Sequence, residues 1–199
     1  QDVFSTVEWE QRSSRITNAD GSVVFEMKNA WTPRQWSQLA TDIMVSKYFR
    51  KAGVPQLGDD GEPILDENGQ PLTGPERSAK QVIHRLAGCW RAWGEKHGYF
   101  DTSGDAETFY DELCWMLLHQ VAAPNSPQWF NTGLHWAYGI SGPPQGHWVN
   151  HPTSGEAMPA NDAYSHPQPH ACFIQSVTDD LVNEGGIMDL WTREARLFK

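Results

Sequence analysis

Cys172 is the residue of this sequence best suited to chemistry, because it follows a loop rich in proline and histidine and begins a short apolar run. The apolar and β-branched residues of 171–177 predict a strand. A cysteine at the start of a strand, approached by a stiff loop, suits a redox or nucleophilic role. Free cysteine is also among the most buried residue types, so composition alone favours a packing role for Cys172.

A second stretch, residues 123–133, reads Ala-Pro-Asn-Ser-Pro-Gln-Trp-Phe-Asn-Thr-Gly. Its two prolines fix the backbone dihedral φ and remove two N–H donors, and Gly133 can adopt positive φ. We therefore predict a rigid loop here. Ser126 stands between turn-forming residues and, taken alone, is most simply a turn serine.

The acidic pair Asp179 and Asp180 lies between the predicted strand and a helical apolar pattern over residues 181–198. Taken alone, aspartates at this position are most simply N-caps of the helix that follows. The pair Gly185-Gly186 weakens the first turns of that helix by roughly 1 kcal/mol per glycine. A strand that leads through an acidic turn into an amphipathic helix is how a βα unit begins.

Four histidines in the irregular region after residue 139 suggest metal binding as a different chemistry. They form two pairs with a spacing of four residues, which are His147 with His151 and His166 with His170. This spacing places two ligands on one face only within a helix, and the neighbouring prolines disfavour a helix. Cysteine and carboxylate ligands are missing from the pattern as well. We therefore expect no metal site and keep a His-loop metal-binding module as an alternative.

Three helices are predicted between residues 30 and 122, which we take as a helical N-terminal domain. Thr32 is a good N-cap for the first helix, which should end near residues 48–53. Ser78 and Asp105 are the expected N-caps of the second and third helices.

Two less regular segments accompany this domain. Residues 1–29 contain two β-prone runs around residues 18–21 and predict a small hairpin. Residues 53–77 are rich in glycine, proline and acidic side chains, which predicts an exposed loop with a turn at 67–69. The ligand spacing of a calcium loop is absent, so we assign this loop no chemistry.

Composition and charge exclude several classes of function. A formal charge of −10 over 199 residues argues against binding of a nucleic-acid backbone. The cysteines Cys89, Cys114 and Cys172 form neither a disulfide framework nor a CxxC site, which fits a reducing cytoplasm. Cys89 and Cys114 fall on apolar helical faces and are expected to pack there. Neither a leader nor an apolar run of transmembrane length is recognisable, and both ends suggest a piece of a longer protein.

Several motifs, taken together and in this order, resemble the N-terminal part of the large chain of adenosylcobalamin-dependent (class II) ribonucleotide reductases. The resemblance covers nearly the whole chain. The motifs are Lys-Tyr-Phe-Arg (47–50), His-Arg-Leu-Ala-Gly (84–88), Ala-Pro-Asn-Ser-Pro (123–127), His-Ala-Cys-Phe-Ile (170–174) and Asp-Asp-Leu (179–181).

The resemblance implies a role for the residues at matching positions. Ser126 would touch the substrate ribonucleotide, and Ala171 and Cys172 would lie against its ribose. The residues of the acidic turn that would help to bind a deoxynucleotide effector, which sets substrate choice, are Asp179, Asp180 and Leu181.

The resemblance also implies a reaction, the radical conversion of ribonucleotides to deoxyribonucleotides for DNA synthesis. Replacing the ribose 2'-hydroxyl by hydrogen consumes two electrons, which two cysteines can supply by closing a disulfide. Cys172 would be one of this redox pair, and its partner would lie beyond the chain. Adenosylcobalamin, bound mainly by regions outside this chain, would start the radical chemistry. The disulfide would be reduced again by a thioredoxin-type dithiol.

The resemblance suggests a ribonucleoside-diphosphate reductase, whereas the residues alone do not distinguish diphosphate from triphosphate substrates. A homodimer is possible as well, and the residues do not decide the oligomeric state. We expect the chain alone to be inactive. The expected fold class is α+β and mainly helical, with residues 123–199 supplying the first strand and helix of an incomplete α/β barrel. Apolar surface on both should then lack partners. The alternative is a non-catalytic helical interaction domain, suggested by ten tryptophans.

Overall fold

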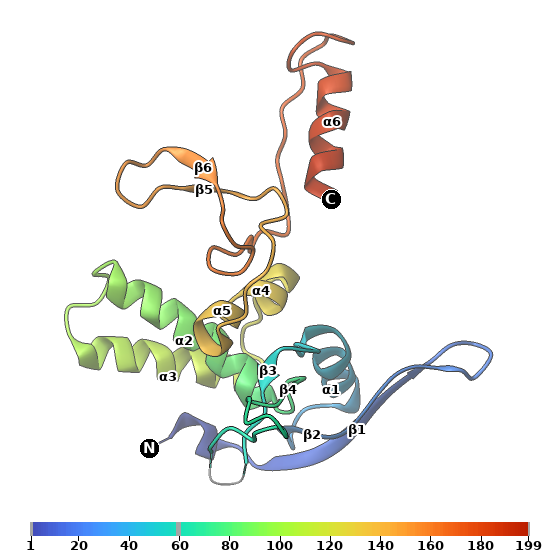
Figure 1. Ribbon diagram of the computed structural model, residues 1–199, viewed down its shortest axis with the longest axis vertical. Helices are drawn as coiled ribbons and strands as arrows, with labels where there is room; N and C mark the ends of the chain where they lie inside the picture. The colour runs from blue at the N-terminus through green and yellow to red at the C-terminus, as the bar shows by residue number, and fades with distance from the viewer. Residues whose placement is uncertain (1, 59–60, 199) are drawn as a thin grey trace.

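A long β-hairpin opens the chain in the computed structural model, which describes residues 2–58 and 61–198 (Figure 1). Its strands are β1 (Trp9–Thr17) and β2 (Val23–Pro33), which pair antiparallel. The turn closes where the backbone N–H of Asn18 donates to the carbonyl of Ser22 at 2.9 Å. The predicted hairpin is therefore confirmed. Its arms are longer than expected because the ladder continues to the pair Trp9–Pro33.

The first helix starts later than predicted. Thr32 is not its N-cap, because Thr32 still pairs with Glu10 in the hairpin. Instead Ser37 caps α1 (Gln38–Ile43), and its hydroxyl accepts from the backbone N–H of Ala40 at 3.1 Å. The short π-helix η2 (Met44–Tyr48) follows directly. Two apolar residues of this short helix, Leu39 and Ile43, are exposed.

Two longer helices pack against each other as an antiparallel pair (Figure 1). They are α2 (Ala79–Lys96) and α3 (Ser103–Leu118). Ser78 caps α2 as predicted and completes a capping box with Gln81. The cap of α3 is Thr102 rather than Asp105, whose carboxylate accepts from the Thr102 backbone N–H at 2.9 Å. The side chain predicted as a cap therefore occupies the third helical position of a capping box.

The segment between α1 and α2 folds back on itself. Strands β3 (Val54–Pro55) and β4 (Thr73–Gly74) pair antiparallel, and the bridge Leu65–Pro71 lies beyond them. The predicted turn near residues 67–69 is confirmed, because the backbone N–H of Gly69 donates to the Asp66 carbonyl at 3.0 Å.

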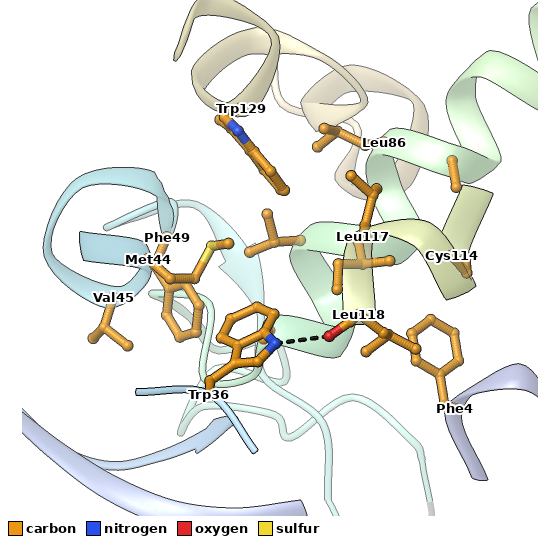
Figure 2. Close-up of a cluster of buried hydrophobic side chains, with 14 of the residues drawn as sticks. Phe4, Trp36, Met44, Val45, Phe49, Leu86, Cys114, Leu117, Leu118 and Trp129 are labelled. Carbon is orange, nitrogen blue, oxygen red and sulfur yellow. Dashed lines mark hydrogen bonds between the residues drawn. The ribbon is translucent and has the colours of Figure 1, made fainter. Parts of the chain in front are cut away.

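One buried apolar cluster joins the helices to the hairpin (Figure 2). Residues of a short 3-10 helix η1 (Val3–Thr6), of β2, of η2 and of α2 to α4 all contribute to it. The indole Nε1 of Trp36 donates to the carbonyl of Leu118 at 2.7 Å, so this large ring is buried without an unpaired polar atom. The cluster includes Phe4, Trp36, Phe49, Leu86, Leu118 and Trp129.

After α3 the chain makes two short helices and then leaves the body as an arm (Figure 1). The helices are α4 (Ser126–Asn131) and α5 (Leu134–Tyr138). The region expected to be irregular carries a small hairpin of β5 (Trp148–Asn150) and β6 (Ala157–Pro159). The arm ends with α6 (Ile187–Phe198).

The strand predicted for residues 171–177 does not form in this chain. These residues run as a single unpaired segment between the β5–β6 hairpin and α6 (Figure 1). The Ile174 side chain is fully exposed. A strand needs a neighbouring strand to complete its hydrogen-bond ladder, and no described strand pairs with this segment. The structure is therefore mixed helix and small sheet, and the incomplete barrel stays a prediction. The expected unpartnered apolar surface is present, as Ile174, Val182 and Trp191 are exposed.

Candidate functional site

Ser126 is the first residue of α4, so the stretch predicted as a rigid loop contains a short helix. The side chain of Asn125 caps this helix by accepting from the backbone N–H of Gln128 at 3.2 Å. Pro127 suits the first turn of the helix, because it has no N–H and its φ is already helical. The two prolines therefore favour a helix start at residue 126, and the Ser126 hydroxyl is left exposed beside it.

The Ser126 hydroxyl has one hydrogen-bond partner, the phenol of Tyr48. The Ser126 Oγ and Tyr48 Oη lie 3.0 Å apart, although 78 residues separate them in the chain. The Tyr48 ring stacks on Trp129 with centroids 5.6 Å apart and planes at 27°, and it also contacts Phe130. Tyr48 closes η2, so this contact joins the end of η2 to the start of α4.

Arg85 lies next to the Tyr48–Ser126 contact and has no exposed surface. Its Nε donates to Glu76 Oε1 at 2.7 Å, which forms a fully buried ion pair. Its two Nη atoms donate to three backbone carbonyls, those of Thr132 and Trp129 at 2.8 Å and that of Tyr48 at 3.2 Å. The guanidinium therefore satisfies carbonyls at the end of α4 and at the end of η2 together.

The Glu76 carboxylate is equally well satisfied. Its Oε2 accepts from the backbone N–H of Arg50 at 2.7 Å, and its Oε1 accepts from the Tyr138 hydroxyl at 2.8 Å. Burial, and then the charge of Glu76, raise the pKa of the Tyr138 phenol, which keeps it protonated as a donor. Sequence reasoning missed Glu76, because it lies in a loop to which we assigned no chemistry. The available signal was Arg85, a charged residue on the apolar face of a helix.

Glycine is required where α2 meets the turn after α4. Gly133 has φ of 82°, and a Cβ there would lie 2.1 Å from the carbonyl oxygen of Arg85. This close approach brings the Thr132 carbonyl within reach of the Arg85 guanidinium. Gly88, one turn after Arg85 in α2, also leaves room for a neighbour, because a Cβ there would lie 2.3 Å from the ring of Trp136.

Cys172 and Ala171 both lie exposed on the arm, before α6. The other two cysteines are buried, as predicted. Burial raises the pKa of Cys89 to about 11 and that of Cys114 to about 12, so neither thiol is a nucleophile near neutral pH. Cys172 is thus the accessible thiol of the chain.

An open cavity of about 760 Å³ brings the end of α4 near the segment that carries Cys172. Asn131 and Phe173 both line it. The Asn131 side chain also donates to the Gln168 carbonyl at 3.3 Å, which ties α4 to this segment. Ser126 and Cys172 are not among the lining residues, so the described chain does not bring the two predicted substrate contacts together.

The acidic turn is built by Asp180 rather than by both aspartates. The Asp180 carboxylate accepts from the backbone N–H groups of Val182 and Asn183 at 2.9 and 2.8 Å. The Asn183 side chain first, and then these amides, hold the pKa of Asp180 below its usual range. Neither aspartate caps a helix as predicted, because α6 begins only at residue 187, after the two glycines. Asp179 and Leu181 are exposed beside the turn.

The four histidines do not converge. Within residues 2–58 and 61–198, no group of three or more His, Cys, Asp or Glu side chains is placed to hold a metal ion. The Nδ1 of His151 accepts from the backbone N–H groups of Thr153 and Ser154, so this nitrogen shapes a turn. The alternative of a His-loop metal module gains no support from this geometry.

Among the helices of the described residues, none is long and apolar enough to cross a membrane.

Comparison with known proteins places these features in a family. Residues 10–120 match the profile of a family described as class II vitamin B12-dependent ribonucleotide reductase. Proteins named vitamin B12-dependent ribonucleotide reductase from Bradyrhizobium diazoefficiens and Agrobacterium fabrum are each 54% identical over 215 residues, covering 100% of this chain. The protein of that name from Rhodopirellula baltica is 42% identical over 197 residues and covers 98% of it. The chain spans only 17% of the length of these relatives.

Proposed function

This chain belongs to the class II vitamin B12-dependent ribonucleotide reductases. We propose that it is part of a longer protein that reduces ribonucleotides to deoxyribonucleotides. The observation that carries the proposal is 54% identity over the entire chain to proteins of that name. Because the chain corresponds to 17% of their length, activity is expected of the longer protein and not of these 199 residues alone.

In this proposal Cys172 is one member of the redox dithiol pair. Replacement of the ribose 2'-hydroxyl by hydrogen releases water and takes two electrons. Two thiols supply these electrons and their protons when they close a disulfide, which a thioredoxin-type dithiol then reduces. The second cysteine must come from outside this chain, because Cys89 and Cys114 are buried in the helical body. The exposure of the Cys172 thiol supports the role, since exchange requires access.

Adenosylcobalamin is proposed to bind mainly to regions outside these residues. The cavity of about 760 Å³ is open, and the one histidine that lines it is His147, whose Nδ1 is buried without a partner among the described residues. The other three loop histidines lie outside it, so no donor set converges on a corrin-sized group. We therefore assign the cofactor to other regions of the longer protein. When bound, it supplies the radical chemistry that starts the reaction.

Ser126 and Ala171 are the proposed substrate contacts besides Cys172. The Ser126 hydroxyl is exposed and held beside Tyr48, so it can hydrogen bond a nucleotide oxygen without burying an unpaired group. Ala171 has no side chain beyond Cβ, which suits close approach of the ribose to the backbone beside Cys172. We propose a ribonucleoside diphosphate as substrate, and a comparison of diphosphates with triphosphates tests that choice.

The acidic turn is the proposed binding site for a deoxynucleotide effector, formed by Asp179, Asp180 and Leu181. The two aspartates should contribute differently. Asp180 is engaged with Val182 and Asn183 and shapes the turn, whereas the Asp179 carboxylate is exposed and can accept from a sugar hydroxyl. Exposed apolar surface at Leu181 leaves room for a base or for a second subunit of a homodimer.

The deciding experiment measures ribonucleotide reduction by the longer protein with a dithiol reductant, with and without adenosylcobalamin. Cofactor-dependent activity that Cys172→Ser abolishes is the expected result. Cys89→Ala is the matched control, because it removes a buried thiol that we place outside the redox pair, and it should keep its turnover. Normal turnover by Cys172→Ser would show that Cys172 is not a member of the redox pair. Absence of reduction under every condition would favour a non-catalytic Trp-rich interaction domain instead.

A further inference from the structure

The Ser126 hydroxyl is the proposed substrate contact, and its direction is set by a group from elsewhere in the chain. A serine hydroxyl on an exposed helix end has several rotamers of similar energy, so a ligand that needs one of them must select it. In this structure the Tyr48 Oη lies 3.0 Å from the Ser126 Oγ and favours one arrangement. A ligand then meets a hydroxyl that is already oriented.

Tyr48 can act in this way because it is itself held on both sides. Its ring lies against Trp129 and Phe130 of α4, with centroids 5.6 and 5.3 Å away. Its backbone carbonyl accepts from Arg85 at 3.2 Å. The ring therefore cannot turn away from Ser126 without losing aromatic contacts that join the two elements.

The same guanidinium fixes the helix that carries Ser126. Arg85 donates at 2.8 Å to the carbonyl of Trp129 in the last turn of α4 and to that of Thr132, the C-cap of this helix. A cation at the C-terminal end of a helix satisfies free carbonyls and interacts favourably with the helix dipole. Glu76 balances the charge of Arg85 in the buried site. Tyr48 and α4 are thus anchored to one rigid point.

We propose that Tyr48 is a positioning residue for substrate binding, which donates its phenolic hydrogen to the Ser126 Oγ and leaves the serine hydrogen free for an oxygen of the nucleotide. The inference rests on the proposed substrate contact of Ser126. A chain of two hydroxyl groups that donate in the same direction strengthens the outer hydrogen bond, because each donor polarises the next.

The test measures steady-state reduction by the longer protein carrying Tyr48→Phe, Ser126→Ala or both. Tyr48→Phe removes one oxygen and keeps the ring that packs on Trp129. Tyr99→Phe is the matched control, because Tyr99 is exposed and its ring contacts His97 at the end of α2. Thermal unfolding of each variant shows whether the fold is retained.

Loss of an oriented hydrogen bond made equally in ground and transition states raises KM and leaves kcat unchanged. We expect KM for the ribonucleotide to rise roughly threefold to tenfold in Tyr48→Phe and in Ser126→Ala. The double variant should be no worse than Ser126→Ala, because Tyr48 acts only through the serine. Tyr99→Phe should match the unaltered protein.

Two other results separate the inference from the function on which it rests. If Ser126→Ala raises KM but Tyr48→Phe does not, or if the two effects multiply in the double variant, Tyr48 does not position Ser126. If Ser126→Ala leaves KM unchanged while the protein still reduces ribonucleotides, the substrate contact itself is wrong. A fall in kcat alone for Tyr48→Phe would point to a role in the chemical step and would overturn positioning.

Discussion

At the scale of single residues, a substitution in the buried pair Arg85–Glu76 should lower the free energy of unfolding most. Glu76→Gln keeps the shape of the side chain but leaves a guanidinium buried without its countercharge. We expect a loss of about 3–5 kcal/mol in the free energy of unfolding, measured by urea denaturation. The matched control is the surface pair Arg34–Glu8, where Arg34→Ala should have no measurable effect. An equal effect at both pairs would contradict the buried network.

The three cysteines should differ sharply in reactivity. The pKa of Cys89 is raised to about 11 and that of Cys114 to about 12, so both stay protonated at neutral pH. Their reactivity should increase only as pH rises toward these values, whereas Cys172 is exposed. Brief treatment with a maleimide at about pH 7 should therefore add one label, at Cys172, detected by mass spectrometry. Denaturant is the control and should expose all three thiols.

Some residue environments could be predicted from sequence and others could not. The burial of Cys89 and Cys114 followed from helical periodicity, and the structure confirms it. Glu76 could not be found in this way, because its role depends on Arg85, Arg50 and Tyr138, which come from different elements. Spacing along one element carries no information about partners brought together by packing. The roles of Ser126 and Cys172 in binding and redox chemistry stay predictions.

At the scale of elements, the crossing of α2 with the turn after α4 should tolerate no side chain. Gly133→Ala would place a Cβ 2.1 Å from the Arg85 carbonyl oxygen and also strain a φ of 82°. Gly139→Ala is the control, because Gly139 has φ of 65° but open space around it. The control should lose about 1 kcal/mol from backbone strain alone. Gly133→Ala should lose clearly more in urea denaturation, and equal losses would refute the close contact.

Local sequence signals predicted which helices form more reliably than the residues at which they begin. Ser78 was predicted as the cap of α2 and is confirmed, because the signal and its partner Gln81 lie within one turn. Thr32 offered an equally good cap, but the hairpin ladder extends to it and uses its backbone. The run 171–177 shows the opposite case, since β-branched residues do not form a strand without a neighbouring strand.

At the scale of the whole molecule, the arm and the helical body should differ in resistance to protease. The body buries one apolar cluster, whereas Phe173, Leu181 and Trp191 on the arm are exposed. Limited digestion of the 199-residue chain with chymotrypsin should cut first within the arm, as identified by mass spectrometry. First cuts within α2 or α3 would contradict this arrangement. The placement of the arm within an α/β barrel stays a prediction, because no described strand pairs with residues 171–177.

The buried network around Arg85 has a consequence for synthesis of the protein. All its partners lie between Tyr48 and Tyr138, and the contact of Tyr48 with Ser126 also closes within that span. Domains fold from the N-terminus onward as the chain leaves the ribosome. The residues of this network therefore leave the ribosome before Cys172 does, so we expect the helical body to fold before the arm is free. The arm then emerges beside a finished surface, so that later segments of the nascent chain assemble on a template that already presents Ser126.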